Sequence, residues 1–95
     1  MYGSVSRWHV KEGKEDELES LVAEIASHPY PGSRRLTIYR SDADRREFWV
    51  AGVFESREAY AANSASPDTD NNFHRIRELL EADPEWHDGE VVVSV

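Results

Sequence analysis

Four short segments of the chain have the apolar patterning of β-strands, in which successive side chains point to opposite faces of a sheet. In the second segment, Leu36 and Ile38 alternate with Thr37 and Tyr39. The third segment is apolar on both faces, and the last contains a run of three valines. The predicted strands are residues 2–10, 34–40, 47–55 and 90–95.

Two regions between these strands have the three-to-four-residue spacing of amphipathic helices. The first helix is predicted over residues 14–27, and its apolar stripe consists of Leu18, Leu21, Val22 and Ile25. The second region is predicted in two pieces, residues 56–62 and 72–82, because the stretch from Pro67 to Asn71 interrupts the pattern. The apolar stripe of the later piece consists of Phe73, Ile76, Leu79 and Leu80.

The order of elements is therefore β-α-β-β-α-β, which predicts an α+β, ferredoxin-like fold. In that fold an antiparallel four-stranded sheet carries both helices on one face. A chain of 95 residues has the length of one domain, so we expect residues 1–95 to form a single unit.

The third strand predicts an apolar surface on the sheet face opposite the helices. That face carries Trp49, Ala51 and Val53. An antiparallel sheet that meets water on one side is expected to be polar there. We therefore expect a homodimer in which two copies pack sheet to sheet through these three residues. The alternative is that these scattered apolar side chains stay in contact with water.

The composition narrows the classes of function. Nineteen acidic and eleven basic residues give a net charge of −8, which disfavours nucleic acid as a partner. The chain has no cysteine, and its four histidines lack the spacing of a metal site, so we expect no metal. The sequence starts without a secretory signal, and its apolar runs are far shorter than the roughly 20 residues of a membrane span. We expect a cytoplasmic protein without a membrane partner.

Three stretches resemble one known family over nearly the whole chain. Residues 7–15, RWHVKEGKE, resemble the family's first strand and the turn that follows it. Pro31 and Gly32 match a Pro-Gly pair before its second strand, and residues 53–60, VFESREAY, resemble the junction between its third strand and second helix. The chain thus resembles the antibiotic biosynthesis monooxygenase (ABM) family of the dimeric α+β barrel superfamily.

The resemblance implies a function as well as a fold. It implies a monooxygenase that needs no cofactor and acts on a small quinol- or anthrone-like aromatic compound. A non-catalytic barrel that binds a small molecule is the first alternative, because the family includes members without assigned chemistry. A haem-binding or haem-degrading relative is the second. That branch resembles this chain less, with asparagine in place of Ser6 and tryptophan in place of Phe54, and only His74 is available to ligate iron.

The resemblance also places a pocket between the sheet and the helices of each monomer. The alternation of the strands then puts their even-numbered residues on its floor, with residues of the second helical region above. The expected substrate-binding residues are Trp8, Phe48, Phe54, Tyr60 and Phe73. An apolar, aromatic pocket with a few polar groups is the ordinary form of a small-molecule site.

The candidate catalytic residues are Asn63, Ser6 and His74, because each can hydrogen-bond to a substrate oxygen. Each also has a structural interpretation. Asn63 could be a solvated helix residue, Ser6 could bond to the backbone, and His74 could pair with Glu78 on the helix surface. Trp86 is expected to be a packing anchor of the loop before the last strand.

Overall fold

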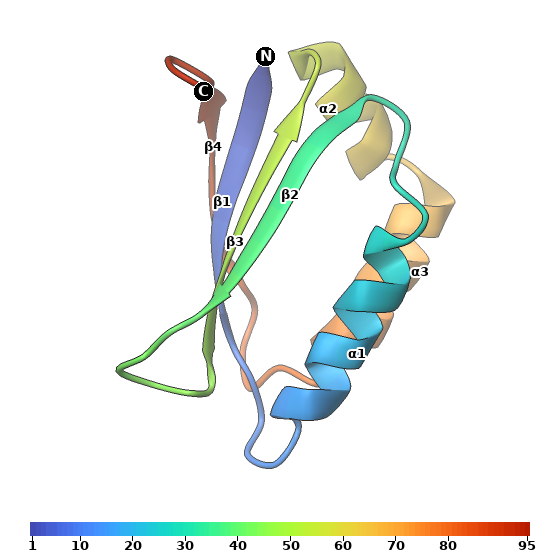
Figure 1. Cartoon of the computed structure of the whole chain (residues 1–95). Coiled ribbons are helices and arrows are strands. Elements are labelled where there is room, and N and C mark those ends of the chain that lie inside the picture. Colours follow the sequence, from blue (N-terminus) through green and yellow to red (C-terminus); the bar gives the residue numbers. More distant parts are fainter.

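A four-stranded antiparallel sheet forms one layer of the structure, and three helices cover one of its faces (Figure 1). The computed structural model describes residues 1–95. In chain order the elements are β1 (Tyr2–His9), α1 (Glu15–Ala26), β2 (Ser33–Arg40), β3 (Glu47–Phe54), α2 (Arg57–Ser64), α3 (Pro67–Arg77) and β4 (Glu85–Glu90). The strand order is β2-β3-β1-β4, and the predicted α+β, ferredoxin-like fold is confirmed.

Strand β1 lies inside the sheet, and its register decides which side chains face the helices. Trp8 lies opposite Phe48 on β3, and Ser6 lies between Val50 on β3 and Trp86 on β4. Because side chains alternate along a strand, the even-numbered residues of these three strands share the helix-covered face. The parity predicted from the sequence for β1 and β3 is therefore confirmed.

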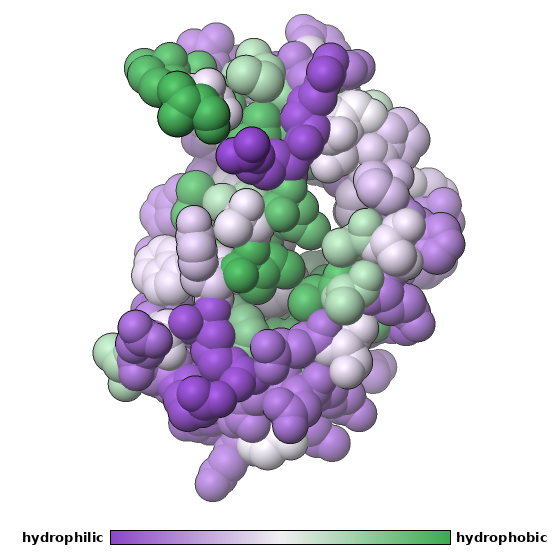
Figure 2. Space-filling view, viewed as in Figure 1, coloured by the Kyte–Doolittle hydropathy of each residue, from purple (hydrophilic) through white to green (hydrophobic).

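The core forms where α1 and the segment after α3 pack on the sheet. Val10, Leu18 and Leu80 are fully buried, and Phe48 is almost so. Helix α1 presents Leu18 to the sheet, and three acidic side chains in its first turn interact favourably with the helix dipole. Figure 2 shows that other hydrophobic residues surround a hollow between the two layers.

The second helical region differs from the prediction at Pro67. Residues 67–71 are not a break, because α3 begins at Pro67 and ends at Arg77, five residues before the predicted end at Ala82. Proline fits the first turn of a helix, where an N–H group would have no partner within the helix. The interruption lies instead at Ala65 and Ser66, between α2 and α3.

The last strand lies earlier in the chain than predicted. The valine run predicts a strand over residues 90–95, but β4 spans Glu85–Glu90, and Val92 and Val93 are exposed beyond it. The partner strand sets this position, because β4 pairs with β1 from Arg7 back to Tyr2. Because an edge strand is held by backbone hydrogen bonds to its single neighbour, a polar segment can form such a strand without alternating apolar residues.

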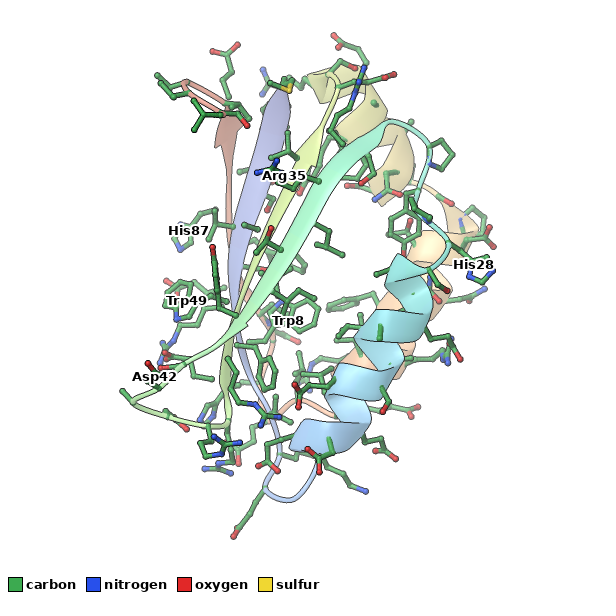
Figure 3. The ribbon with its side chains drawn as sticks, in the orientation of Figure 1. Trp8, His28, Arg35, Asp42, Trp49 and His87 are labelled. Atoms are coloured by element: carbon green, nitrogen blue, oxygen red, sulfur yellow. The ribbon has the colours of Figure 1, made fainter.

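The face of the sheet opposite the helices is partly apolar and uncovered. Its exposed or partly exposed apolar residues are Val5, Tyr39, Trp49, Ala51 and Val53. In Figure 3 the side chain of Trp49 projects away from the helices, whereas Trp8 projects toward them. The two apolar faces predicted for β3 are therefore present.

We expect Leu18→Ala to lower the free energy of unfolding by about 2–5 kcal/mol, because it removes a fully buried side chain and leaves a cavity. Ser20→Ala, on the exposed side of the same helix, should change it by less than about 0.5 kcal/mol. Urea denaturation of both variants measures the two values. Equal losses at the two positions would contradict the assignment of the buried stripe.

Candidate functional site

A cavity of about 520 Å³ lies between the sheet and the helices. Helix-facing residues of the sheet, among them Ser6, Trp8 and Phe54, form its floor, and residues of all three helices form its walls. Its volume lies within the range of about 300–1,000 Å³ that is typical of small-molecule sites. The hollow in Figure 2 lies between the same two layers and is lined with hydrophobic residues.

Aromatic side chains supply much of the cavity surface. The ring of Phe54 meets the ring of Tyr60 edge-on, with 5.5 Å between their centroids. The ring centroids of Phe73 on α3 and Trp86 on β4 lie 6.0 Å apart. Of the residues expected to bind substrate, the structure brings four together at the cavity: Trp8, Phe54, Tyr60 and Phe73.

Ser6 lies on the cavity floor, where its hydroxyl group is occupied by a neighbour. The indole Nε1 of Trp8 donates a hydrogen bond to Ser6 Oγ at 2.9 Å, and Ser6 is only 1% exposed. A buried indole N–H without a partner would cost about 1–3 kcal/mol. Ser6 therefore first of all accepts the hydrogen bond of the buried Trp8 N–H and holds the indole ring in place.

Asn63 lies in the cavity wall near the end of α2, and a neighbour fixes its amide group. Thr69 on α3 donates a hydrogen bond from Oγ1 to Asn63 Oδ1 at 2.8 Å. This bond occupies the carbonyl end of the amide, and the Nδ2 group has no partner within the protein. A cavity-lining N–H donor is thus free to bind an oxygen atom of a ligand.

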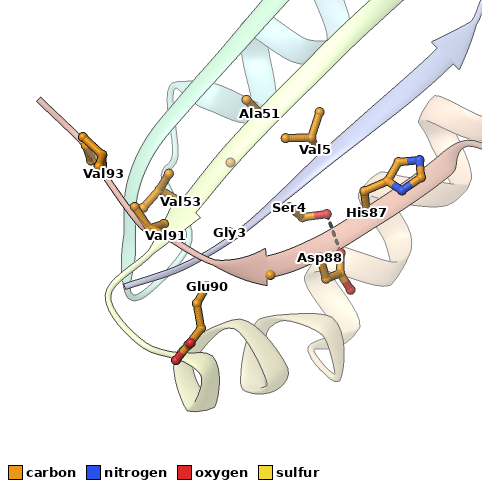
Figure 4. A pocket seen from close by; sticks show the side chains of 13 residues that line it. Gly3, Ser4, Val5, Ala51, Val53, His87, Asp88, Glu90, Val91 and Val93 are labelled. Carbon is orange, nitrogen blue, oxygen red and sulfur yellow. Dashed lines mark hydrogen bonds between the residues drawn. The ribbon is translucent and has the colours of Figure 1, made fainter.

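Asp88 brings a carboxylate to the cavity from β4. Ser4 Oγ and the Tyr60 hydroxyl both donate to Asp88 Oδ1, at 2.5 Å and 3.0 Å. Figure 4 shows the bond between Ser4 and Asp88 across the two paired strands. Burial raises the pKa of Tyr60, and the hydrogen bond to Asp88 raises it further, so this phenol remains a donor at neutral pH.

Two of the predicted site residues lie elsewhere. Phe48 is 2% exposed and belongs to the core, where the guanidinium group of Arg40 lies 5.2 Å from the centre of its ring. His74 lies on the exposed side of α3, outside the cavity. Its nearest carboxylate is that of Asp70 at 3.8 Å, not that of Glu78 as expected.

Sequence reasoning missed several cavity residues, among them Trp86, Asp88 and Tyr30. Trp86 and Asp88 lie on β4 and not in a loop, so the expectation that Trp86 anchors a loop is wrong. Both have the parity of Ser6 and Ser4 on β1, which lie opposite them. Tyr30 also lines the cavity, and its hydroxyl accepts a hydrogen bond from Asn72 at 2.8 Å. The polar segment 85–90 has no apolar alternation that could have identified the β4 pair.

A smaller hollow of about 370 Å³ lies against the C-terminal tail, and Figure 4 shows it from close by. Its apolar lining includes Val5 and Val53 of the uncovered sheet face and Val91 and Val93 of the tail. The backbone N–H of Val91 donates to the carbonyl of Met1, which fixes the start of the tail beside β1.

No three histidine, aspartate or glutamate side chains are grouped so that they could hold a metal ion. No helix has the length and apolar character that crossing a membrane requires.

Comparison with known proteins links the fold to one family. A family model described as antibiotic biosynthesis monooxygenase matches residues 1–75 of the chain. No curated protein sequence matches the chain. The family match ends before β4, so Trp86 and Asp88 lie outside it.

Several solved structures share the fold. SnoaB, a cofactor-independent oxygenase from Streptomyces nogalater solved as a mutant, has a TM-score of 0.85 and 22% identity, with 99% of this chain and 95% of that chain covered. A Chloroflexus aurantiacus protein, provisionally described as an antibiotic biosynthesis monooxygenase, has a TM-score of 0.83, 25% identity and the same coverage. A conserved protein from Methanosarcina mazei has a TM-score of 0.83 and 14% identity over 93% and 89% of the two chains.

We expect Ser6→Ala to lower the free energy of unfolding by about 1–3 kcal/mol, because it leaves the buried N–H of Trp8 without an acceptor. In a Trp8→Phe background the same change should cost clearly less, since no N–H remains to satisfy. Chemical denaturation of the four proteins of this double-mutant cycle measures the coupling. A coupling energy near zero would show that Ser6 does not serve Trp8.

Proposed function

Because the chain belongs to the antibiotic biosynthesis monooxygenase family, we propose that it is a cofactor-independent monooxygenase that acts on a small quinol- or anthrone-like aromatic compound. The observation that carries this proposal is an aromatic cavity with the unpaired amide N–H group of Asn63 in its wall. The likeness of the fold to that of SnoaB, a cofactor-independent oxygenase, supports it.

In this reaction the aromatic substrate supplies the electrons. For an anthrone, one ring CH₂ group and O₂ give a carbonyl group and water. The protein's part is to hold the electron-rich anion of the substrate away from water and to stabilise its oxygen atom. Trp8 and Phe73 offer apolar surface to the rings, and Asn63 Nδ2 donates a hydrogen bond to the oxyanion.

We assign this hydrogen bond to Asn63 and not to the two other candidates. Ser6 is only 1% exposed and its Oγ is held by the indole N–H of Trp8, and His74 lies outside the cavity. The position of His74 also speaks against a haem-handling role, because it was the one histidine available as an iron ligand.

Binding without turnover is the second candidate function. It is favoured by the absence of a buried base at the cavity, where the two carboxylates, those of Asp70 and Asp88, are both exposed. Oxygen consumption with anthrone distinguishes the two functions. Uptake of O₂ supports the monooxygenase, whereas saturable binding of anthrone without uptake supports the binding protein.

We expect Asn63→Ala to lower turnover of anthrone by about 10- to 100-fold with little change in melting temperature, because the substrate oxyanion loses its donor. Thr69→Val should cause a smaller loss, since it frees the amide of Asn63 to rotate. Asn71→Ala, an exposed asparagine on α3, is the matched control. An oxygen-electrode assay measures all three, and unchanged turnover in Asn63→Ala would remove this residue from the mechanism.

We also propose that two copies of the chain form a homodimer through the uncovered sheet face. Trp49, Ala51 and Val53 lie on that face, and the apolar hollow of Figure 4 adjoins it. A stable interface of this kind buries about 1,200–2,000 Å² in total. Dimer formation removes the apolar side chains of the uncovered sheet face from water, and this burial drives the association.

We expect Trp49→Glu to shift the protein from dimer to monomer at micromolar concentration, because it places a charge beside Glu47 in an apolar interface. Ala23→Glu, which adds the same charge on the exposed side of α1, should leave the dimer intact. Analytical ultracentrifugation measures the mass, and circular dichroism checks that both variants fold. A monomeric wild-type protein would contradict the proposed interface.

A further inference from the structure

Asp88 has a free acceptor atom at the cavity. Both of its hydrogen-bond donors, Ser4 and Tyr60, bind the same carboxylate oxygen, Oδ1. The other oxygen, Oδ2, has no hydrogen-bond partner in the protein, and no lysine, arginine or histidine forms an ion pair with this carboxylate. The two donors therefore hold the group in one orientation and leave one oxygen available.

The surroundings of this carboxylate favour a ligand as its partner. The ring of Tyr60 is half-buried against the rings of Phe54 and Tyr2, so the donor side of Asp88 is fixed by packed aromatic groups. Asp88 is among the residues that line the cavity. When an aromatic ligand fills such a site it displaces water from the carboxylate, and the lost hydrogen bonds must be replaced by a donor on the ligand.

The position of Asp88 also complements that of Asn63. Asn63 follows Tyr60 by three residues on α2, so the two side chains lie one helical turn apart on the same side of the helix. Tyr60 holds Asp88, and Asn63 carries the free N–H group. The cavity therefore offers one acceptor and one donor on neighbouring parts of its wall.

We propose that Asp88 determines ligand specificity: its free oxygen accepts a hydrogen bond from a hydroxyl group on the aromatic ligand, and its charge excludes aromatic carboxylates. The proton stays on the ligand, and Asp88 acts by orienting the ring. This inference rests on the proposed function, because it takes an aromatic ligand in this cavity as given. It adds that ligands with a hydroxyl donor beside an oxygen that Asn63 can bind are preferred over ligands with the oxygen alone.

Three naphthalene probes of similar size separate these requirements: β-naphthol has a donor, β-methoxynaphthalene has only an acceptor, and β-naphthoate has a negative charge. Quenching of the fluorescence of Trp8 and Trp86, which both line the cavity, reports their binding. We expect wild-type protein to bind β-naphthol about 10- to 100-fold more tightly than β-methoxynaphthalene, as a charge-assisted hydrogen bond allows. We expect β-naphthoate to bind most weakly.

Asp88→Asn is the decisive variant. Its carbonyl oxygen can still accept from Ser4 and Tyr60, which places an NH₂ donor where the free carboxylate oxygen was. The preference for β-naphthol over β-methoxynaphthalene should then fall at least about tenfold, and β-naphthoate should gain affinity. Glu90→Gln makes the same charge change two residues further along β4, outside the cavity, and should leave all three affinities unchanged.

The outcomes separate this inference from the proposed function. Equal binding of β-naphthol and β-methoxynaphthalene by wild-type protein overturns the role of Asp88 and leaves the aromatic cavity standing. If Asp88→Asn weakens the binding of β-naphthol and β-methoxynaphthalene equally and lowers the melting temperature, the specificity role of Asp88 is also overturned, because the residue then has a structural role only. Failure of all three probes to bind the wild-type protein overturns the aromatic ligand itself, and with it both proposals.

Discussion

The pairing of β1 with β3 is the constraint on which the rest of the structure depends. The two strands pair over eight consecutive residues, with Trp8 opposite Phe48 and Ser4 opposite Gly52. A slip of one residue would turn Trp8 and Ser6 away from the helices and put Arg7 in their place. The same register also positions β4, because β1 pairs with it on its other edge. Cavity floor, core and uncovered face therefore follow from one set of backbone hydrogen bonds.

The polar side chains at the cavity differ in which donor and acceptor atoms remain free to bind a ligand. On the floor, the indole N–H of Trp8 donates to Ser6 Oγ and is therefore not available to a ligand. Asn63 and Asp88 are each held at one end by a neighbouring side chain, and each keeps its other end free. In both residues a hydrogen bond within the protein already fixes the orientation of the side chain. This lowers the conformational entropy lost when a ligand binds. Asn63 thus offers a ligand a donor, and Asp88 offers it an acceptor.

Most of the fold could be predicted from the sequence, but the cavity only in part. The apolar residues of β1 and β3 were a strong signal for buried strands. The alternation of side chains along these strands then correctly placed Trp8 and Phe54 on the helix side. Alternation failed for β4, because this polar edge strand has no apolar alternation and the valines after it led to a strand being predicted too late in the chain. Asp88 and Trp86 were missed for that reason. The free end of Asn63 could not be foreseen either, because it depends on Thr69 of another helix.

The fold constrains the apolar part of the cavity more tightly than its polar part. Trp8 and Phe54 are buried, so replacing either disturbs packing between the layers. Asn63 is only half-buried on a short helix, and Asp88 is exposed on an edge strand, so both can be replaced without opening the core. Related chains can therefore share this architecture at 14–25% identity and still present different polar groups to a ligand. The proposed roles of Asn63 and Asp88 therefore fall on two positions that the core does not fix.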